Sequence, residues 1–135
     1  MESVLSKITE DACRTLQALV GQEDVFQRIA KAAIASLKSG GKILACGNGG
    51  SAADAMHLTQ ELVGRFRSNR PSLPAVSLAA DPTALTCIGN DFGFENVFSR
   101  QVEGLADKND LLVCFSTSGN SPTYSARSKP RDPKA

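Results

Sequence analysis

One segment, residues 41–61, constrains the fold of this chain more than any other. An apolar run at residues 43–46 leads into a glycine-rich turn at residues 47–51, and an alanine-rich stretch with helical spacing follows. This order is typical of a strand, a tight turn and a helix in a parallel α/β sheet. The helix carries His57 and Glu61 four residues apart, so both lie on one face. The segment therefore predicts a loop that can approach an anion closely, with a carboxylate near it.

Two further apolar runs repeat the strand pattern, at residues 75–78 and 111–115. Helical patterns over about residues 51–66 and 94–105 separate the three runs. Strands that alternate with helices indicate a parallel, doubly wound sheet between layers of helices. Each run ends in small, polar or glycine residues, which is where open parallel sheets bind their ligands.

The two ends of the chain differ in character. Residues 3 to about 20 and about 25–37 have apolar side chains at helical spacing, with Gly21 between them, so we expect an N-terminal pair of helices that covers a sheet or packs against another subunit. The last 13 residues, 123–135, hold four basic residues and two prolines without apolar periodicity. We expect a disordered basic tail there, and one domain over residues 1–122.

Composition limits the function classes. A net charge of +1 gives no general attraction to nucleic acid or to an anionic membrane. No run approaches the roughly 20 apolar residues of a membrane helix, and the N-terminus lacks the apolar core of a signal peptide. The four cysteines have no metal or redox spacing, so we interpret them as reduced core thiols of a cytoplasmic protein. Partners of nucleic-acid or membrane type are not expected.

The glycine-rich turn has two possible ligands. Residues 47–52 fit the G-x-G-x-x-A pattern of dinucleotide-binding turns, but Asp81 lies 34 positions after Gly47, too far for the expected ribose carboxylate. The hydroxyl-rich loop at residues 116–122 is the better partner, because its side chains and amides can cradle a phosphate. A serine-rich turn that only caps a helix remains an alternative.

Four polar residues have open roles. Asn90 and Asp91, in a predicted loop at residues 89–94, either bind sugar hydroxyls or form a turn before a helix. His57 is the chain's single histidine. With Glu61 it is an exposed helix pair, two ligands of a zinc site, or a general base with its orienting partner.

Four ordered motifs carry a resemblance to a known family. They are Cys46-Gly-Asn-Gly-Gly-Ser-Ala-Ala-Asp-Ala, His57-Leu-Thr-Gln-Glu-Leu-Val-Gly-Arg-Phe66, Leu85-Thr-Cys-Ile-Gly-Asn-Asp-Phe-Gly-Phe94 and Ser116-Thr-Ser-Gly-Asn-Ser-Pro122. Together, from about residue 1 to Pro122, they closely resemble the bacterial phosphoheptose isomerases, which are sugar isomerase (SIS) domain proteins. The motifs keep their order and sensible spacing, so this signal is far more specific than the glycine turn alone.

The resemblance implies an aldose–ketose isomerase. It would convert sedoheptulose 7-phosphate to D-glycero-D-manno-heptose 7-phosphate, a step of heptose and lipopolysaccharide biosynthesis. Glu61 would be the catalytic base and would also contact the substrate. His57 and Glu61 would ligate zinc where family members bind it. The other implied substrate-binding residues are Asn48, Gly49, Gly50, Asn90, Asp91, Ser116, Thr117, Ser118 and Ser121.

The resemblance also implies parts that this chain does not contain. Family members have five parallel strands and assemble as homotetramers, and a C-terminal helix supplies a second histidine and a glutamine. We expect a truncated or frameshifted version with three of the five strands. Residues 111–115 would then form an unpaired edge strand, so we expect a poorly soluble chain or a multimer. The alternative function is a non-catalytic SIS module that binds a sugar phosphate or a protein, like the replication-initiator-associating homologues.

Overall fold

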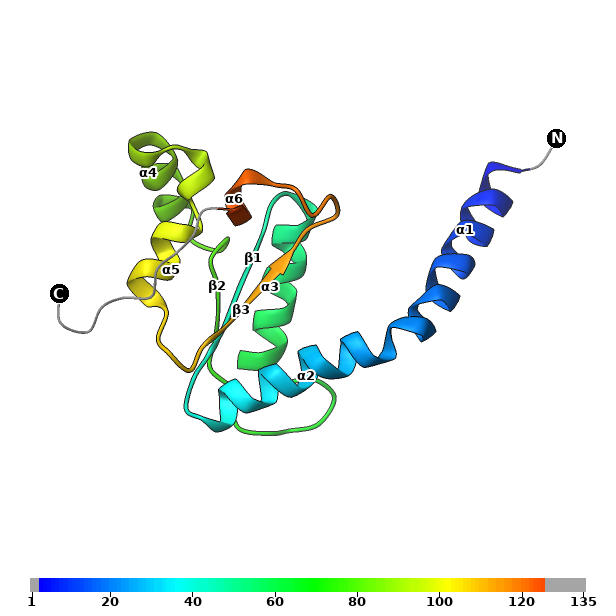
Figure 1. Cartoon of the computed structure of the whole chain (residues 1–135), viewed down its shortest axis with the longest axis horizontal. Helices are drawn as coiled ribbons and strands as arrows, with labels where there is room; N and C mark the ends of the chain where they lie inside the picture. Colours follow the sequence, from blue (N-terminus) through cyan, green and yellow to red (C-terminus); the bar gives the residue numbers. More distant parts are fainter. Residues whose placement is uncertain (1–2, 126–135) are drawn as a thin grey trace. The chain divides into compact units, whose positions relative to one another are not determined.

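The computed structural model of the chain describes residues 3–125 (Figure 1). Its elements, in chain order, are α1 (Val4–Leu19), the 3-10 turn η1 (Val20–Gln22), α2 (Glu23–Lys38), β1 (Ile43–Gly47), α3 (Gly50–Val63), β2 (Ala75–Ser77), α4 (Pro82–Phe92), the 3-10 turn η2 (Phe94–Asn96), α5 (Ser99–Leu105), β3 (Leu111–Phe115) and α6 (Pro122–Ser125). They fall into two compact units that divide after Ile34, each described by itself below. Within the described range, no helix is both long and apolar enough to span a membrane.

The first unit consists of α1, η1 and most of α2. The predicted helix pair is confirmed, although Gly21 does not open a loop, because η1 continues the helical backbone from α1 into α2. Both helices carry apolar side chains that this unit leaves exposed, among them Val4, Leu5, Ile8, Leu16, Leu19, Phe26 and Ile29. A shallow groove of about 460 Å³ runs between residues 16 and 29. An unpartnered apolar surface of this kind is typical of an interaction site.

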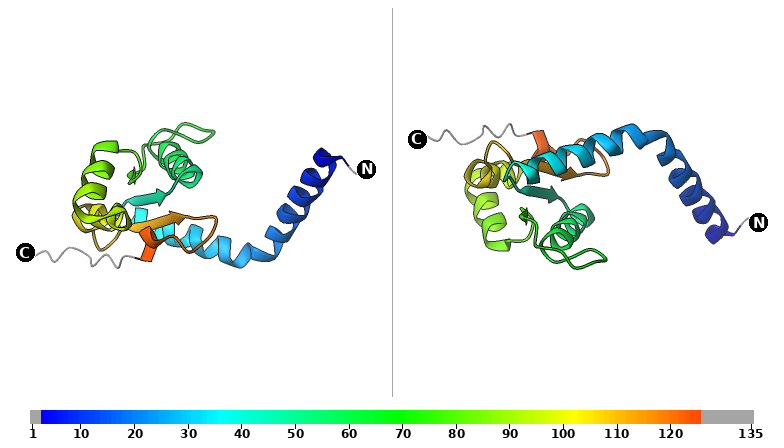
Figure 2. Two further views of the ribbon diagram at one scale, coloured as in Figure 1. Left: turned by 90° about the horizontal axis from the view of Figure 1, so that it is seen from above. Right: turned by 90° about the horizontal axis from the view of Figure 1, so that it is seen from below.

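The second unit is a parallel sheet of three strands in the order β2-β1-β3. The sheet is in register from Ile43, which is opposite Ala75 on one side and Leu111 on the other. All five residues of β1 are buried, as expected of the central strand. Helix α3 lies on one face of the sheet, and α4 and α5 lie on the other (Figures 1 and 2). The predicted parallel α/β sheet between helices is therefore confirmed.

The core on the α5 face joins the sheet to the C-terminal half of the unit. Its buried residues are Leu44, Cys46, Leu78, Val97, Phe98 and Val102. Tyr124 packs against this cluster, and its ring stacks on Phe98 with the centroids 6.1 Å apart. Burial of such side chains contributes roughly 1.5–3 kcal/mol each. The aromatic pair therefore holds the segment after β3 against the sheet.

The predicted disordered tail begins too early. Thr123 is buried and Tyr124 half-buried within α6, and the Tyr124 hydroxyl donates a 2.8 Å hydrogen bond to the carbonyl oxygen of Phe115. A ring that stacks in the core and a satisfied hydroxyl offset the cost of ordering this turn. Residues 126–135 of the predicted tail lie outside the described part of the chain.

The predicted loop at residues 89–94 is wrong for its first four residues, which form the last turn of α4. Asp81 caps this helix, and its side chain accepts hydrogen bonds from the amides of Thr83 and Ala84. The hydrogen bond from the Thr83 hydroxyl and those from the two amides hold the pKa of Asp81 below its ordinary value. Helix α4 ends where Gly93 takes a φ of 87°. The expected helix at 94–105 is divided into η2 and α5.

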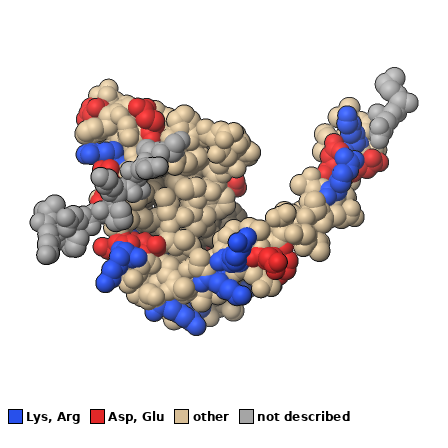
Figure 3. Space-filling view, in the orientation of Figure 1, with Lys and Arg blue, Asp and Glu red and all other residues tan. Residues whose placement is uncertain are grey.

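Strand β3 is an edge of the sheet within residues 3–125. Its residues alternate between half-buried and exposed, and Leu112 is 38% exposed. The surface over β3 and α3 is mostly uncharged in the view of Figure 3. Apolar, uncharged edges of this kind favour pairing with another chain.

Candidate functional site at the carboxyl ends of the strands

The glycine-rich turn adopts a conformation that its glycines permit. A Cβ atom on Gly47 would lie 2.2 Å from the carbonyl oxygen of Ser51, so no other residue fits there without moving the backbone. Gly49 has a φ of 56° and caps the N-terminus of α3. The amides of Ser51 and Ala52 donate to the carbonyls of Asn48 and Gly49. The turn thus places the N-terminal end of α3, with its partial positive charge, at the carboxyl end of β1.

The hydroxyl-rich loop lies beside this turn. Gly47 and Phe115 are register partners, so the loops that follow β1 and β3 leave the sheet side by side. The Asn48 side-chain amide donates a 2.9 Å hydrogen bond to the Thr123 hydroxyl and links the two segments. Ser116 Oγ accepts from the amide of Gly119. The structure therefore brings Asn48, Gly49 and Gly50 next to the loop that carries Ser116, Thr117, Ser118 and Ser121.

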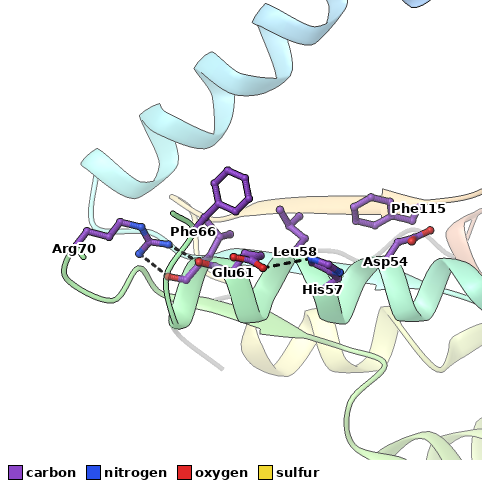
Figure 4. Close-up of a pocket in the computed structure, with 8 residues that line it drawn as sticks. Asp54, His57, Leu58, Glu61, Phe66, Arg70 and Phe115 are labelled. Carbon is purple, nitrogen blue, oxygen red and sulfur yellow. Dashed lines mark hydrogen bonds and ion pairs between the residues drawn. The ribbon is translucent and has the colours of Figure 1, made fainter. Parts of the chain in front are cut away.

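A pocket of about 580 Å³ lies along α3 (Figure 4). Its lining comes from α3, from the segment after it and from the end of β3: Asp54, His57, Leu58, Glu61, Leu62, Phe66, Arg70 and Phe115. Phe115 is the last residue of β3 and immediately precedes the hydroxyl-rich loop. The pocket therefore extends along α3 from Asp54 and Phe115 to Arg70, with Glu61 in its lining, and its size suits a small ligand.

The predicted pair on α3 is present in this pocket. His57 Nε2 lies 3.4 Å from Glu61 Oε1, and the histidine side chain is 73% exposed while that of Glu61 is 28% exposed. Gln60 donates a 2.7 Å hydrogen bond to the same Glu61 oxygen. Glu61 is thus held by two neighbours through one oxygen, and it is more enclosed than His57. A carboxylate in this setting is suited to proton transfer with a bound ligand.

Arg70 closes the other end of the pocket and was not singled out by sequence. Its guanidinium donates to the carbonyl oxygens of Glu61 and Leu62, the latter at 2.8 Å (Figure 4). These carbonyls belong to the last turn of α3, where helix carbonyls have no partner within the helix. Arg70 therefore fixes the backbone of the turn that carries Glu61. No spacing rule points to it, because the contact spans a loop.

Asp54 was also missed, although its position could have been found. It precedes His57 by three residues and Glu61 by seven, so all three share one face of α3. The helical spacing that pairs His57 with Glu61 applies equally to this carboxylate. Phe115, by contrast, reaches the pocket only through the pairing of β3 with β1.

Asn90 and Asp91 are not brought to this pocket. They lie on the last turn of α4, a helix on the opposite face of the sheet from α3 (Figure 1). The Asn90 amide donates a 2.7 Å hydrogen bond to Asp91 Oδ1. The Cys87 thiol lies 3.6 Å from Asp91 Oδ2. Within one chain, these two predicted substrate-binding residues and the Glu61 pocket belong to separate places.

The residues described do not complete a zinc site. No group of three or more His, Cys, Asp or Glu side chains close enough to hold a metal ion occurs among residues 3–125. His57 and Glu61 supply two donors of the types that zinc prefers, whereas a protein zinc site needs three or four protein ligands. No chemical step below is therefore assigned to a metal.

The fold and this site define a class: a parallel α/β protein with two candidate phosphate-binding loops at the carboxyl ends of its strands and a carboxylate-lined pocket along α3. The sequence model of the SIS domain family matches residues 9–126. The chain therefore belongs to the SIS domain family.

The similar proteins include phosphoheptose isomerases. The protein of that name from Cytophaga hutchinsonii is 48% identical over 124 residues, which are 90% of this chain and 64% of the relative. That of Burkholderia pseudomallei is 50% identical over 119 residues, 86% of this chain and 60% of the relative. This chain thus spans less than two thirds of these relatives' length.

Solved structures give the same picture. The structure of a phosphoheptose isomerase from Francisella tularensis superposes with a TM-score of 0.80 at 35% identity, covering 91% of this chain and 66% of that one. The structure of phosphoheptose isomerase from Neisseria gonorrhoeae gives 0.74 at 41% identity, covering 89% and 64%. The three strands and their helices therefore match the corresponding part of these enzymes' fold.

Proposed function

We propose that this chain acts in an aldose–ketose isomerase that converts sedoheptulose 7-phosphate to D-glycero-D-manno-heptose 7-phosphate. The observation that carries the proposal is Glu61, a partly enclosed carboxylate in a pocket that also includes Phe115, the residue before the hydroxyl-rich loop. The relatives named phosphoheptose isomerase support the choice of substrate. In this proposal the product serves heptose and lipopolysaccharide biosynthesis in the cytoplasm, a compartment that suits the four free thiols.

The proposed chemistry is a proton transfer between C1 and C2 of the sugar. The amides at the start of α3 and the hydroxyls of residues 116–121 would hold the phosphate. Glu61 would take the proton alpha to the carbonyl and return it to the neighbouring carbon. Arg70 would keep the turn that carries Glu61 in place through the two backbone carbonyls it binds.

Zinc enters this proposal only as an additional group. His57 and Glu61 would supply two of its ligands, and the others would come from another copy of the chain. When bound, the ion would stabilise negative charge on the sugar oxygens.

Replacing Glu61 by glutamine tests the proposed base. We expect turnover of sedoheptulose 7-phosphate in a coupled isomerase assay to fall at least about 100-fold, because the amide cannot accept the proton. Glu103→Gln is the matched control, since Glu103 is a half-exposed carboxylate of α5 whose partner is Arg100. Turnover that survives Glu61→Gln would refute the role of Glu61.

A non-catalytic sugar-phosphate-binding module is the second candidate. It is favoured by the two candidate phosphate-binding loops, which lie together without any contribution from Glu61. Calorimetry with the sugar phosphate separates the two functions. Binding by the wild-type chain and by Glu61→Gln, with no turnover by either, would identify the module, whereas turnover by the wild-type chain alone would identify the enzyme.

We also propose that the chain assembles through its N-terminal helices, in keeping with the homotetramer implied by the family. The support is the exposed apolar surface of α1 and α2, on which Phe26 is 68% exposed. Light scattering should give a mass that is a multiple of 14.2 kDa. Phe26→Glu should shift the chain toward smaller species, and Gln27→Glu, the neighbouring exposed position, should not. A stable wild-type monomer would contradict the proposal.

A further inference from the structure

Two cysteines face each other across the strands that carry the candidate ligand loops. Cys46 on β1 and Cys114 on β3 are register partners, and their sulfur atoms lie 3.5 Å apart. Paired strands are about 4.8 Å apart, which falls within the Cα separation of about 4.4–6.8 Å that a disulfide requires. Both thiols are free in this structure. The two sulfur atoms would have to move only slightly closer together to form a covalent bond.

The two thiols have unequal surroundings. Cys46 is buried in the core, whereas Cys114 is exposed. The hydrogen bond from the Cys46 thiol lowers the pKa of Cys114 to about 7. The same hydrogen bond, together with burial, raises the pKa of Cys46. Cys114 is therefore the accessible thiolate of the pair, and Cys46 is the thiol next to it. This is the arrangement of a reactive cysteine with a resolving partner.

We propose that Cys46 and Cys114 form an oxidation site at which hydrogen peroxide creates a disulfide between β1 and β3. The Cys114 thiolate attacks one peroxide oxygen, which breaks the O–O bond, releases hydroxide and leaves a sulfenic acid. The Cys46 sulfur then attacks the Cys114 sulfur, forms the S–S bond and displaces the sulfenic oxygen, which leaves as water with the Cys46 proton. The two thiols lose two electrons, and one peroxide is reduced to two waters.

The other two cysteines lack this arrangement. Cys13 lies exposed on α1, in the first unit, and Cys87 lies exposed on α4. The Cys87 thiol donates a 3.6 Å hydrogen bond to Asp91 Oδ2 rather than to another cysteine. Oxidation is therefore directed to the β1–β3 pair.

The position of the bond links it to the ligand loops. Cys46 immediately precedes Gly47, and Cys114 immediately precedes Phe115, where the two loops begin. A disulfide would tie together the strand ends from which both loops leave the sheet. It would join residues 68 positions apart in the sequence.

The test uses the full chain carrying Cys13→Ser and Cys87→Ser, so that only the pair remains. After treatment with hydrogen peroxide, we expect both thiols to disappear together in a thiol count. The mass of the chain should fall by two hydrogen atoms, and a non-reduced digest should contain one cross-linked pair of peptides. Dithiothreitol should restore both thiols. Adding Cys114→Ser, an exposed change, should slow oxidation of Cys46 at least about 10-fold.

Three results would overturn the proposal. One is accumulation of two or three oxygens on Cys114 without a cross-link. Another is a disulfide that forms only between two chains. The third is oxidation of Cys46 at the same rate with and without Cys114. Circular dichroism of each variant ensures that the comparison is made between folded chains.

Discussion

Alanine at position 47 is expected to lower the free energy of unfolding by about 4 kcal/mol or more. An added Cβ would lie 2.2 Å from the carbonyl oxygen and 2.3 Å from the carbonyl carbon of Ser51, and 2.8 Å from the amide nitrogen of Ala52. All three are backbone atoms at the start of α3, so no side-chain rotation relieves the clash. The whole helix would have to move away from the central strand. Urea unfolding followed by circular dichroism measures the loss.

Gly50→Ala is the matched control for this prediction. A Cβ at Gly50 would meet no atom within 4 Å, and the residue already lies in α3. Alanine there should stabilise the chain by roughly 0.5–1 kcal/mol, because it restricts the unfolded backbone. Equal stability of the two variants would show that close packing of the turn against α3 does not explain the glycine at position 47.

The strands, their order in the chain and the ligand loops were predictable because short-range patterns encode them. The apolar runs at residues 43–46, 75–78 and 111–115 each form a strand; the first two boundaries differ by one residue, and the third agrees. The glycine turn was predictable for the same reason, since its chemistry lies within a few consecutive residues. Such local signals do not depend on tertiary contacts with the rest of the chain.

The errors have two causes: a capped helix continued further than local propensity indicated, and contacts formed between residues distant in sequence. Asn90 and Asp91 favour turns, yet the helix that Asp81 caps continues through them to Gly93. Tyr124 lies in a polar segment of the sequence, yet its ring stacks on that of Phe98. Cys114 was expected in the core, but it is exposed because β3 has no neighbour on its outer side in the described chain. Arg70 and Phe115 entered the pocket in the same way, through tertiary contacts alone.

Removing the carboxylate of Asp110 is expected to cost about 3 kcal/mol of stability at neutral pH, a value typical for breaking a buried ion pair. The Asp110 side chain is only 4% exposed, and its Oδ2 lies 2.5 Å from the ammonium of Lys42. It also accepts 2.8 Å hydrogen bonds from the backbone amides of Lys42 and Asp107. Asp110→Asn would place an amide N–H against donors and leave the Lys42 charge without its partner. Thermal and urea unfolding of the two chains measure the difference.

Asp107→Asn is the control, since Asp107 faces the same lysine at 3.5 Å but its side chain is 82% exposed. An exposed ion pair contributes only about 0–1 kcal/mol, so this change should leave stability nearly unaltered. Both residues precede β3, whereas the candidate ligand loops follow β1 and β3, so they lie at opposite ends of the strands. Neither change should therefore alter binding of a sugar phosphate by the chain that remains folded. Similar losses in the two variants would contradict the buried-pair explanation.

The same pair predicts how stability depends on pH. Burial by itself would raise the pKa of Asp110, but the hydrogen bonds from Lys42 and from two amides lower it below the ordinary value of 3.8. The hydrogen bond to Asp110 raises the pKa of Lys42 above 10.5. The contribution of Asp110 is then fully present above pH 3.8 and is lost as the pH falls through its lower folded pKa. That of Lys42 is present below pH 10.5 and is lost as the pH rises through its higher folded pKa.

The difference in free energy of unfolding between the wild-type chain and Asp110→Asn should therefore be constant between about pH 5 and pH 9. It should decrease below and above this range. Acid decreases this difference because protonated Asp110 no longer attracts the ammonium. Base decreases it because neutral Lys42 is no longer attracted to a carboxylate. Urea unfolding at a series of pH values measures both edges. If the difference in free energy of unfolding stays constant down to pH 2, then the shape and hydrogen bonding of Asp110, rather than its charge, explain its contribution to stability.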